Sequence, residues 1–355
     1  MSMNRILTVG VVGLGYWGPN LARNFNHLPG CRLGALCDLD PERLEKMRTL
    51  YPKVAHYVSF NQMLEEANLD AVIVATPVHQ HFPLGRAALL AGKHVLIEKP
   101  LASGVAECEE LIALAGRSGL TLMTGHIFVY SSAVQLIRKF ISSGDLGDIR
   151  YINSQRLNLG LYQNDINVVW DLAPHDLSMI LFLLDSSPSA VNCQGHANIT
   201  PGIEDVANVS LSFACGRFAT VQSSWLEPRK VRQMTIVGTR QMIIYDDIEP
   251  LEKIRIYDTR IERPPHYNSL GEFQYAYHYG DSFIPRLDQI EPLRQMSQHF
   301  LDCIHSGEPP LSSGERGLEV VRILEACSAS LKTNGGRIAI QTTAESSREA
   351  RGFAQ

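Results

Sequence analysis

An apolar run that leads into three closely spaced glycines lies within the first twenty residues of the chain. The run Val9–Val12 is followed by Gly13, Leu14, Gly15, Tyr16, Trp17 and Gly18. In this spacing the first glycine makes a tight bend, the second leaves room for a diphosphate, and the third lets the next helix pack on its strand. A helix that starts here directs its unpaired N–H groups at the anion. The pattern predicts a strand, a phosphate-binding turn and a helix from Tyr16 or Trp17.

A second apolar run ends in an acidic residue at the distance that a dinucleotide site requires. The run 33–37 leads to Asp38, and no arginine follows it immediately. A carboxylate at this position accepts hydrogen bonds from the adenine ribose hydroxyls and repels a 2′-phosphate. The glycine turn and Asp38 together predict NAD as the cofactor, rather than NADP.

The two parts of the chain differ in their pattern of apolar segments. Residues 1–126 alternate short apolar strands with helices, which predicts a doubly wound parallel sheet of the Rossmann type. Residues 127–340 begin with a strand between two helices, at 131–143 and 172–184. Strand-like segments at 190–197, 206–214, 217–225, 231–237 and 242–245 follow. The fold class expected is therefore α/β plus α+β, with an open, largely antiparallel second sheet that helices cover on one face.

The remaining segments complete the expected organisation. Two helices at 291–306 and 314–333 close the fold, and residues 341–355 form a polar tail. We assign 1–126 to dinucleotide binding and 127–340 to substrate binding and oligomerisation. A dimer or tetramer is expected to bury the open face of the second sheet. Alternating apolar residues would supply this burial, with their parity deciding the face, such as Val209, Leu211, Phe213, Phe218 and Val221.

Composition excludes several classes of function. The net charge is −5 and the basic residues are scattered, so we expect no nucleic-acid partner. The seven cysteines are far apart, and no cysteines or acids accompany His79 and His81, so no metal site is expected. The apolar stretch Met179–Leu184 is too short to cross a membrane. The N-terminus resembles a strand rather than a signal peptide, which indicates a cytoplasmic protein.

Four further segments resemble the Gfo/Idh/MocA oxidoreductase family, together with the glycine turn. They are Ala75-Thr76-Pro77 with His81, the string Ala91-Gly92-Lys93-His94-Val95-Leu96-Ile97, its continuation Glu98-Lys99-Pro100, and Asp171-Leu172-Ala173-Pro174-His175-Asp176. The resemblance extends over about residues 5 to 340. It implies hydride transfer between NAD(P) and a sugar or cyclitol carbinol. It also implies that Thr76, Pro77, His81, Glu98 and Lys99 contact the cofactor.

Three residues are the catalytic candidates. Lys99 follows a parallel strand at the edge where doubly wound sheets bind ligands, and its ammonium could stabilise an alkoxide. Asp171 and His175 are four residues apart and share one helix face. An imidazole takes a proton near neutral pH, and the carboxylate could orient it or bind a substrate hydroxyl. We expect His175 to be the base.

The segment before Asp171 bears on the substrate. Many family members have a Gly-Gly pair there, whereas this chain has Val168-Val169. The segment is similar to the branch that acts on nucleotide-linked N-acetylamino sugars, which implies C3 oxidation of a UDP-linked N-acetylhexosamine such as UDP-N-acetylglucosamine, for lipid A or O-antigen. Candidate sugar or diphosphate ligands are Arg156, Asn158, Tyr162, Asn164, Arg229, Lys230 and Arg232.

Several alternatives stay open from the sequence. The aromatic residues of 273–279 could stack a uracil or lie in a subunit contact. The enzyme could instead be a dehydrogenase of inositol, of a free sugar or of a UDP-sugar uronate. It could also be a ketoreductase that works in the opposite direction in deoxysugar synthesis. A catalytically silent NAD-binding sensor or scaffold is the alternative outside the enzymes, although such a protein has no need of Lys99, Asp171 and His175 together.

Overall fold

The computed structural model describes residues 5–160, 162–262 and 276–341. The chain divides into two compact units, one formed by Met1–Ser131 with Ile290–Glu325 and the other by Ser132–Gln289 with Ala326–Gln355. This division differs from the boundary expected at residue 126. The reason is that α8 (Pro292–Ser306) packs against α1 (Gly18–His27) and η2 (Ile127–Tyr130). The first turns of α9 (Gly314–Lys332) belong to the same unit. The functions assigned to the two parts stay predictions.

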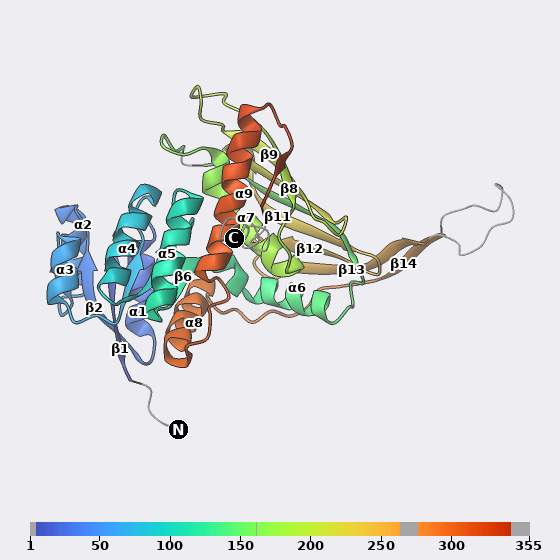
Figure 1. Ribbon diagram of the computed structural model, residues 1–355. Helices are drawn as coiled ribbons and strands as arrows, with labels where there is room; N and C mark the ends of the chain where they lie inside the picture. Colours follow the sequence, from blue (N-terminus) through green and yellow to red (C-terminus); the bar gives the residue numbers. More distant parts are fainter. Residues whose placement is uncertain (1–4, 161, 263–275, 342–355) are drawn as a thin grey trace, which may run out of the picture. The chain divides into compact units, whose positions relative to one another are not determined.

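The first unit contains the parallel sheet that the sequence predicts. Its strand order is β3-β2-β1-β4-β5-β6, and every neighbouring pair is parallel (Figure 1). Because crossovers between parallel strands are right-handed, the reversal of strand order at β1 and β4 puts α1 and α2 on one face and α4 and α5 on the other. The strands are β1 (Leu7–Val12), β2 (Cys31–Cys37), β3 (Ala55–Tyr57), β4 (Ala71–Val74), β5 (His94–Glu98) and β6 (Leu122–Gly125).

Helices connect these strands. They are α1 (Gly18–His27), α2 (Pro41–Leu50), α3 (Phe60–Glu66), α4 (His81–Leu90) and α5 (Val105–Ser118), with short 3₁₀ turns η1 (Val78–Gln80) and η2 (Ile127–Tyr130). Asp40 caps α2 by accepting a hydrogen bond from the N–H of Glu42, as its position before Pro41 predicts. The segments β3 and α3 are short, and the sequence pattern did not indicate them.

The glycine turn has the backbone geometry that its residues predict. Gly13 has a φ of +87°, which favours glycine, and a Cβ at Gly18 would stand 1.9 Å from the carbonyl oxygen of Gly13. Helix α1 therefore packs against the turn only because Gly18 has no side chain. The helix begins at Gly18 with Pro19 in its first turn, slightly later than the expected Tyr16 or Trp17.

The second unit is built on a nine-stranded sheet with the order β14-β13-β12-β11-β7-β10-β9-β8-β15. All of its pairs are antiparallel except β7 with β10. Helix α7 (Val168–Leu184) packs on β7, β9 and β10 and against α6 (Ser132–Ser142). The strands are β7 (Ile149–Leu159), β8 (Ala190–His196), β9 (Val206–Ser212), β10 (Phe218–Ser224), β11 (Leu226–Gly238), β12 (Met242–Asp246), β13 (Ile254–Glu262), β14 (Ala276–Phe283) and β15 (Ile338–Ala339).

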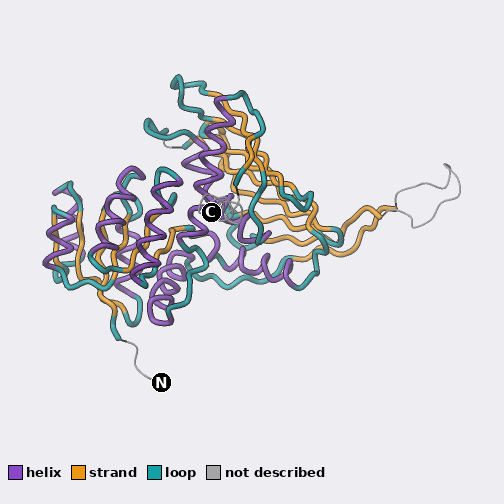
Figure 2. Tube along the Cα trace, viewed as in Figure 1, coloured by secondary structure: helices purple, strands orange, loops and turns teal. Residues whose placement is uncertain are grey.

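The residues expected on the open face of this sheet lie mostly on the other face. Val209, Leu211 and Val221 are buried within the unit, on the side that helix α7 covers, and Phe213 just after β9 is also buried. Because alternate residues of a strand point to opposite faces, Phe218 points away from them and is 43% exposed. The expectation of an apolar open face built from this set is wrong for every member except Phe218. In Figure 2 the described helices of this unit lie on one side of its sheet.

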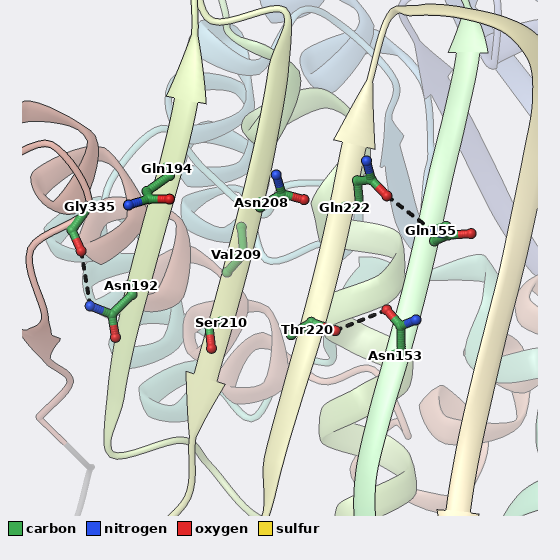
Figure 3. Close-up of a pocket in the computed structure, with 10 residues that line it drawn as sticks. All are labelled: Asn153, Gln155, Asn192, Gln194, Asn208, Val209, Ser210, Thr220, Gln222 and Gly335. Carbon is green, nitrogen blue, oxygen red and sulfur yellow. Dashed lines mark hydrogen bonds between the residues drawn. The ribbon is translucent and has the colours of Figure 1, made fainter.

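Amide and hydroxyl side chains occupy the centre of the open face. They surround a hollow of about 530 Å³ and are joined across strands, Gln155 to Gln222 at 3.1 Å and Thr220 to Asn153 at 2.9 Å (Figure 3). The residues that line the hollow are Asn153, Gln155, Asn192, Gln194, Asn208, Val209, Ser210, Thr220, Gln222 and Gly335, none of which is charged. The side chain of Val209 itself points to the other face of β9.

Candidate active site

Asp38 lies beside the glycine turn at the end of β2. Its Oδ2 accepts a hydrogen bond from the N–H of Leu14 at 2.5 Å, and its Oδ1 accepts one from the N–H of Asp40 at 2.8 Å. The buried carboxylate is thereby fixed against the turn. Since a carboxylate offers about four lone pairs, both oxygens can still accept hydrogen bonds from ribose hydroxyls.

Arg43 is a neighbour of Asp38 that the sequence analysis missed. Its Nη1 lies 3.7 Å from Asp38 Oδ2, and its Nε lies 3.2 Å from Asp40. The signal was present in the sequence, because Arg43 comes three residues after the helix N-cap Asp40 and so lies in the first turn of α2. A guanidinium at this place partly offsets the charge that distinguishes NAD from NADP.

The residues around the turn fit a dinucleotide. A Cβ at Gly15 would meet only Arg43 Nη1, at 3.7 Å, so the backbone is open on that side. The buried Oγ1 of Thr76 has no hydrogen-bond partner among the described residues. Tyr16 is 79% exposed and its ring stands edge-on to that of Trp17. Gly13 to Gly18, Asp38 and Thr76 would therefore hold NAD.

His81 has both ring nitrogens against backbone carbonyl oxygens. Its Nδ1 lies 2.7 Å from the carbonyl oxygen of Pro100, and its Nε2 lies 2.8 Å from that of Thr76. Burial lowers the pKa of His81, so the ring favours its neutral form. Both nitrogens face the backbone. We therefore interpret His81 as a link between the loop of Thr76 and Pro77 and the turn after β5, rather than as a direct ligand of the cofactor.

Glu98 ends strand β5 and Lys99 follows it, next to a histidine that the sequence analysis did not single out. Burial raises the pKa of Glu98 to about 7, and its Oε2 accepts a hydrogen bond from the N–H of Lys99 at 3.2 Å. His126 follows the neighbouring strand β6. Burial, together with the charge of Lys99, lowers the pKa of His126 to about 3, and neither ring nitrogen has a partner among the described residues. Lys99 thus has two buried titratable neighbours.

Helix α7 carries the other two catalytic candidates. It starts at Val168, a turn before the expected position, because Asn167 caps it by accepting a hydrogen bond from the N–H of Trp170. Asp171 and His175 are one turn apart on the same face, as their spacing predicts, and both are half-buried.

Trp225 was not identified from the sequence, yet it contacts two of the candidates. Its Nε1 donates a hydrogen bond to Asp171 Oδ2 at 3.1 Å, and its ring centroid lies 5.0 Å from that of Tyr162. The structure therefore brings Asp171 and Tyr162 together around one buried indole. No spacing in the sequence indicates this contact, because Trp225 lies in a different strand connection.

Arg156 lies beneath α7 rather than in the loop before it. Its Nε donates to Asp176 Oδ2 at 2.5 Å, and Ser154 donates to the other oxygen at 2.6 Å. Both charged side chains are buried. Since a buried guanidinium that is paired in this way is committed to its partner, we interpret Arg156 as holding α7 on the sheet rather than as a sugar ligand.

The other candidate ligands differ in exposure. Asn158 has a buried Oδ1 with no hydrogen-bond partner among the described residues, and Asn164 is exposed. Arg229 and Lys230 are exposed on β11, whereas Arg232 lies 3.5 Å from Asp247. Of the aromatic segment, residues 273–275 lie outside the described ranges. Tyr277 and Tyr279 are exposed, and their rings are stacked.

The described residues show neither a metal centre nor a membrane segment. No group of three or more His, Cys, Asp or Glu side chains in these ranges is placed to hold a metal ion. Among the same residues, no helix has the length and apolar character that crossing a bilayer requires.

Comparisons with known proteins place both units in one family. The model of the oxidoreductase family with an NAD-binding Rossmann fold, Gfo/Idh/MocA, matches residues 7–126. The model of the C-terminal domain of the same family matches residues 134–244. Together the two models cover more than half of the chain.

Individual relatives match over nearly their whole length. The UDP-N-acetylglucosamine 3-dehydrogenase of Acidithiobacillus ferrooxidans is 27% identical over 89% of this chain and 94% of its own. Its crystal structure superposes with a TM-score of 0.79 at 24% identity, covering 94% and 99% of the two chains. The myo-inositol 2-dehydrogenase of Thermotoga maritima is 23% identical over 92% of this chain and 96% of its own.

A third relative is known from its complex. The WlbA dehydrogenase from Bordetella pertussis, solved with NADH and UDP-GlcNAcA, has a TM-score of 0.78 at 18% identity and covers 96% of this chain and 99% of its own. At that identity the likeness shows the fold. The two family models agree with the observed sheet topology, with the glycine turn and with Asp38 beside it. The chain belongs to the Gfo/Idh/MocA family and is an NAD-dependent oxidoreductase that acts on a CH–OH group.

Proposed function

We propose that the enzyme oxidises the C3 hydroxyl of a UDP-linked N-acetylhexosamine, with UDP-N-acetylglucosamine as the first candidate. The 3-keto product would serve an aminotransferase in making amino sugars for lipid A or O-antigen. The observation that carries the proposal is the pair Asp171 and His175 on one face of α7, with Asp171 held by Trp225 beside Tyr162. The similarity to a UDP-N-acetylglucosamine 3-dehydrogenase over 89% of the chain supports this choice of substrate.

His175 is the proposed base. Its imidazole takes the proton of the C3 hydroxyl as general base. Asp171, one turn earlier on the same face, orients the imidazole or accepts a hydrogen bond from a neighbouring sugar hydroxyl.

Lys99 is the proposed stabiliser of the alkoxide. Its ammonium follows β5 at the edge of the parallel sheet where ligands bind in this architecture. A cation there favours the charge that develops on the substrate oxygen. NAD, when bound, would supply the hydride acceptor for C3, and the glycine turn with Asp38 would hold it.

The nucleotide part of the substrate needs positive and polar partners. With Arg156 and Arg232 paired to carboxylates, Arg229 and Lys230 remain the exposed basic candidates for the diphosphate. Asn158 is the proposed amide ligand, because its buried Oδ1 has no partner among the described residues. Tyr162 and Asn164 would complete the contacts to the sugar.

A substrate panel tests the proposal. The purified protein is incubated with NAD and either UDP-N-acetylglucosamine, UDP-N-acetylgalactosamine, a UDP-linked uronate, free N-acetylglucosamine or myo-inositol. NADH absorbance and product mass are followed. We expect the UDP-linked N-acetylhexosamines to give NADH and a product two mass units lighter. Faster turnover of myo-inositol or a free sugar would favour the alternative that the Thermotoga relative represents. No turnover in either direction would favour an NAD-binding sensor.

We also propose that the enzyme works in the cytoplasm as a homo-oligomer. Its seven cysteines are free, as expected in a reducing compartment. The uncharged centre of the open face can meet a second copy of itself across a twofold axis without repulsion between like charges. Light scattering should give a dimer or tetramer, and Gln222→Lys in the middle of this face should shift it toward monomer. A monomeric wild-type protein at micromolar concentration would contradict the proposal.

A further inference from the structure

Trp225 occupies a junction of three segments in the second unit. It lies between β10 and β11, and only 1% of its surface is exposed. Its N–H donates to the carbonyl oxygen of Asp205 at 2.9 Å, and its own carbonyl oxygen accepts from the N–H of Gly160 at 3.3 Å. The backbone of Trp225 is therefore tied to the loop before β9 and to the end of β7.

The side chain of Trp225 adds a third connection. The indole Nε1 donates to Asp171 Oδ2 at 3.1 Å. An indole N–H is a donor only and does not titrate in the accessible pH range. The hydrogen bond therefore fixes one carboxylate oxygen in the same way at every pH at which Asp171 is charged.

The indole ring also contacts the loop that precedes α7. The ring of Tyr162 lies 5.0 Å from it, inclined by 56°, and the Tyr162 hydroxyl accepts from the N–H of Thr200 at 3.2 Å. A displacement of Tyr162 must therefore change the packing on the same ring that holds Asp171, because interiors are close-packed.

We propose that Trp225 is the positioning residue of the active site: its indole N–H sets the orientation of the Asp171 carboxylate, and its ring couples that orientation to the loop of Tyr162. The proposal deepens the proposed function, since it rests on the role of Asp171 there. Trp225 itself touches neither the substrate nor the cofactor. Its effect on the reaction passes through Asp171, and its effect on sugar binding passes through Tyr162.

A neighbouring tryptophan provides a matched control. Trp170, which precedes Asp171 in α7, donates its indole N–H to Ser328 Oγ at 2.9 Å. Trp170→Phe and Trp225→Phe each remove one indole hydrogen bond from α7 and keep an aromatic ring. Only the second removes a donor from Asp171.

An NMR measurement tests the contact without any substrate. The chain has three tryptophans, Trp17, Trp170 and Trp225, so the full-length protein gives three indole N–H signals. Single Phe variants assign them. In Asp171→Asn the Trp225 signal should move upfield and exchange faster with solvent, by more than the Trp170 signal, while Trp17 stays in place. A Trp225 signal that does not respond would overturn the proposal.

Kinetics test the positioning role. Trp225→Phe should lower kcat about 10- to 100-fold, the effect of losing one hydrogen bond to a charged group, with KM for NAD unchanged. Trp170→Phe should change kcat less than about threefold. In the Asp171→Asn background, Trp225→Phe should cost little more, because both changes remove the same interaction. The proposal would be contradicted if the losses in kcat from Trp225→Phe and Asp171→Asn were fully additive. It would also be contradicted if Trp170→Phe lowered kcat as much as Trp225→Phe. A wild-type protein inactive on every UDP-sugar would contradict the proposed function, while the NMR response would still decide the contact.

Discussion

The glycine turn of the first unit and the junction around Trp225 in the second are fixed in different ways. The turn is local, because Gly13, Gly18 and Asp38 lie within 26 residues of sequence. Gly18 packs against the carbonyl oxygen of Gly13, and the Asp38 carboxylate accepts a hydrogen bond from the backbone N–H of Leu14. The junction joins Tyr162, Asp171 and Trp225 through side chains from separate segments. Cofactor binding therefore depends on a short pattern, whereas the groups proposed for proton transfer depend on packing over long sequence distances.

This contrast predicts which substitutions separate cofactor binding from turnover. Changes in the second unit should alter turnover or folding and leave NAD affinity intact. Changes at Asp38, beside the glycine turn, should alter the choice of cofactor.

The largest expected effect is at His175. His175→Ala should lower turnover by about 10²- to 10⁴-fold, the usual contribution of a positioned general base. NAD affinity should stay unchanged, since the glycine turn and Asp38 belong to the other unit. The exposed His196 of the same unit is the control, and His196→Ala should keep normal turnover.

Lys99→Ala sharpens the same test. It should also reduce the rate of single-turnover hydride transfer. The loss of rate in the double variant with His175→Ala should be smaller than the sum of the two single losses, because both residues act on one transition state. A stable, NAD-binding His175→Ala enzyme with wild-type turnover would end the assignment of His175 as base and shift the role to Lys99.

The buried ion pair under α7 should give the next largest effect. Asp176→Asn leaves the guanidinium of Arg156 without its charge partner and should lower the free energy of unfolding by about 3–5 kcal/mol. The more exposed pair Arg138–Asp185, 3.3 Å apart, is the control, and Asp185→Asn should cost less than about 1 kcal/mol. Urea denaturation measures both. Equal losses would show that burial of the pair has no special role in holding α7.

The buried carboxyl of Glu98 should make stability depend on pH. Its pKa is about 7 in the folded protein, against an ordinary value of 4.5. The folded state keeps the proton longer, so this contribution is complete below pH 4.5 and is lost as pH rises to about 7. The loss amounts to about 3 kcal/mol. Comparing the unfolding of wild type and Glu98→Gln between pH 4.5 and 8 measures it. The prediction would be contradicted if the difference in free energy of unfolding between wild type and Glu98→Gln stayed constant over this pH range.

The buried His126 should make folding stability depend on pH in the opposite direction. Its pKa is about 3 in the folded protein, against an ordinary value of 6.5. The unfolded chain takes up the proton first as the solution is acidified. The contribution of neutral His126 is therefore complete above pH 6.5 and lost as pH falls toward 3. His126→Gln should remove this acid dependence, which the same unfolding series would detect.

The smallest expected effect concerns cofactor choice. Asp38→Ser should reduce the preference for NAD over NADP about tenfold, because it removes a charged acceptor from the ribose and leaves Arg43 to pair with a 2′-phosphate. In the double variant Asp38→Ser with Arg43→Ala, the use of NADP should no longer be improved by a guanidinium beside the 2′-phosphate. The ratio of kcat/KM for the two cofactors measures it. A wild-type enzyme that prefers NADP would contradict the role of Asp38.

Much of the first unit could be predicted from sequence because its signals are local. Continuous apolar strands, the glycine spacing and the Asp40-Pro41 helix start each indicate a structure within a few residues. The short elements β3 and α3 were not predicted, because three and seven residues are too few to show a hydrophobic periodicity.

The second unit was predicted as a class of sheet but not in its side-chain contacts. Alternation showed that the strands have two faces, but it did not tell which face the helices cover, so Val209 and Val221 were assigned to the wrong one. The pairing of Arg156 with Asp176 and of Trp225 with Asp171 follows from strand order and helix packing. Neither is encoded in a spacing along the chain.

The most direct test of the central claim follows the hydrogen at C3. UDP-N-acetylglucosamine with deuterium at C3 is incubated with the enzyme and NAD, and both products are analysed by mass spectrometry. The account predicts reduced cofactor heavier by one mass unit and a 3-keto sugar that has lost the label. Unlabelled NADH beside a sugar that keeps its deuterium would place the oxidation at another carbon and contradict the account, as would the absence of any NADH.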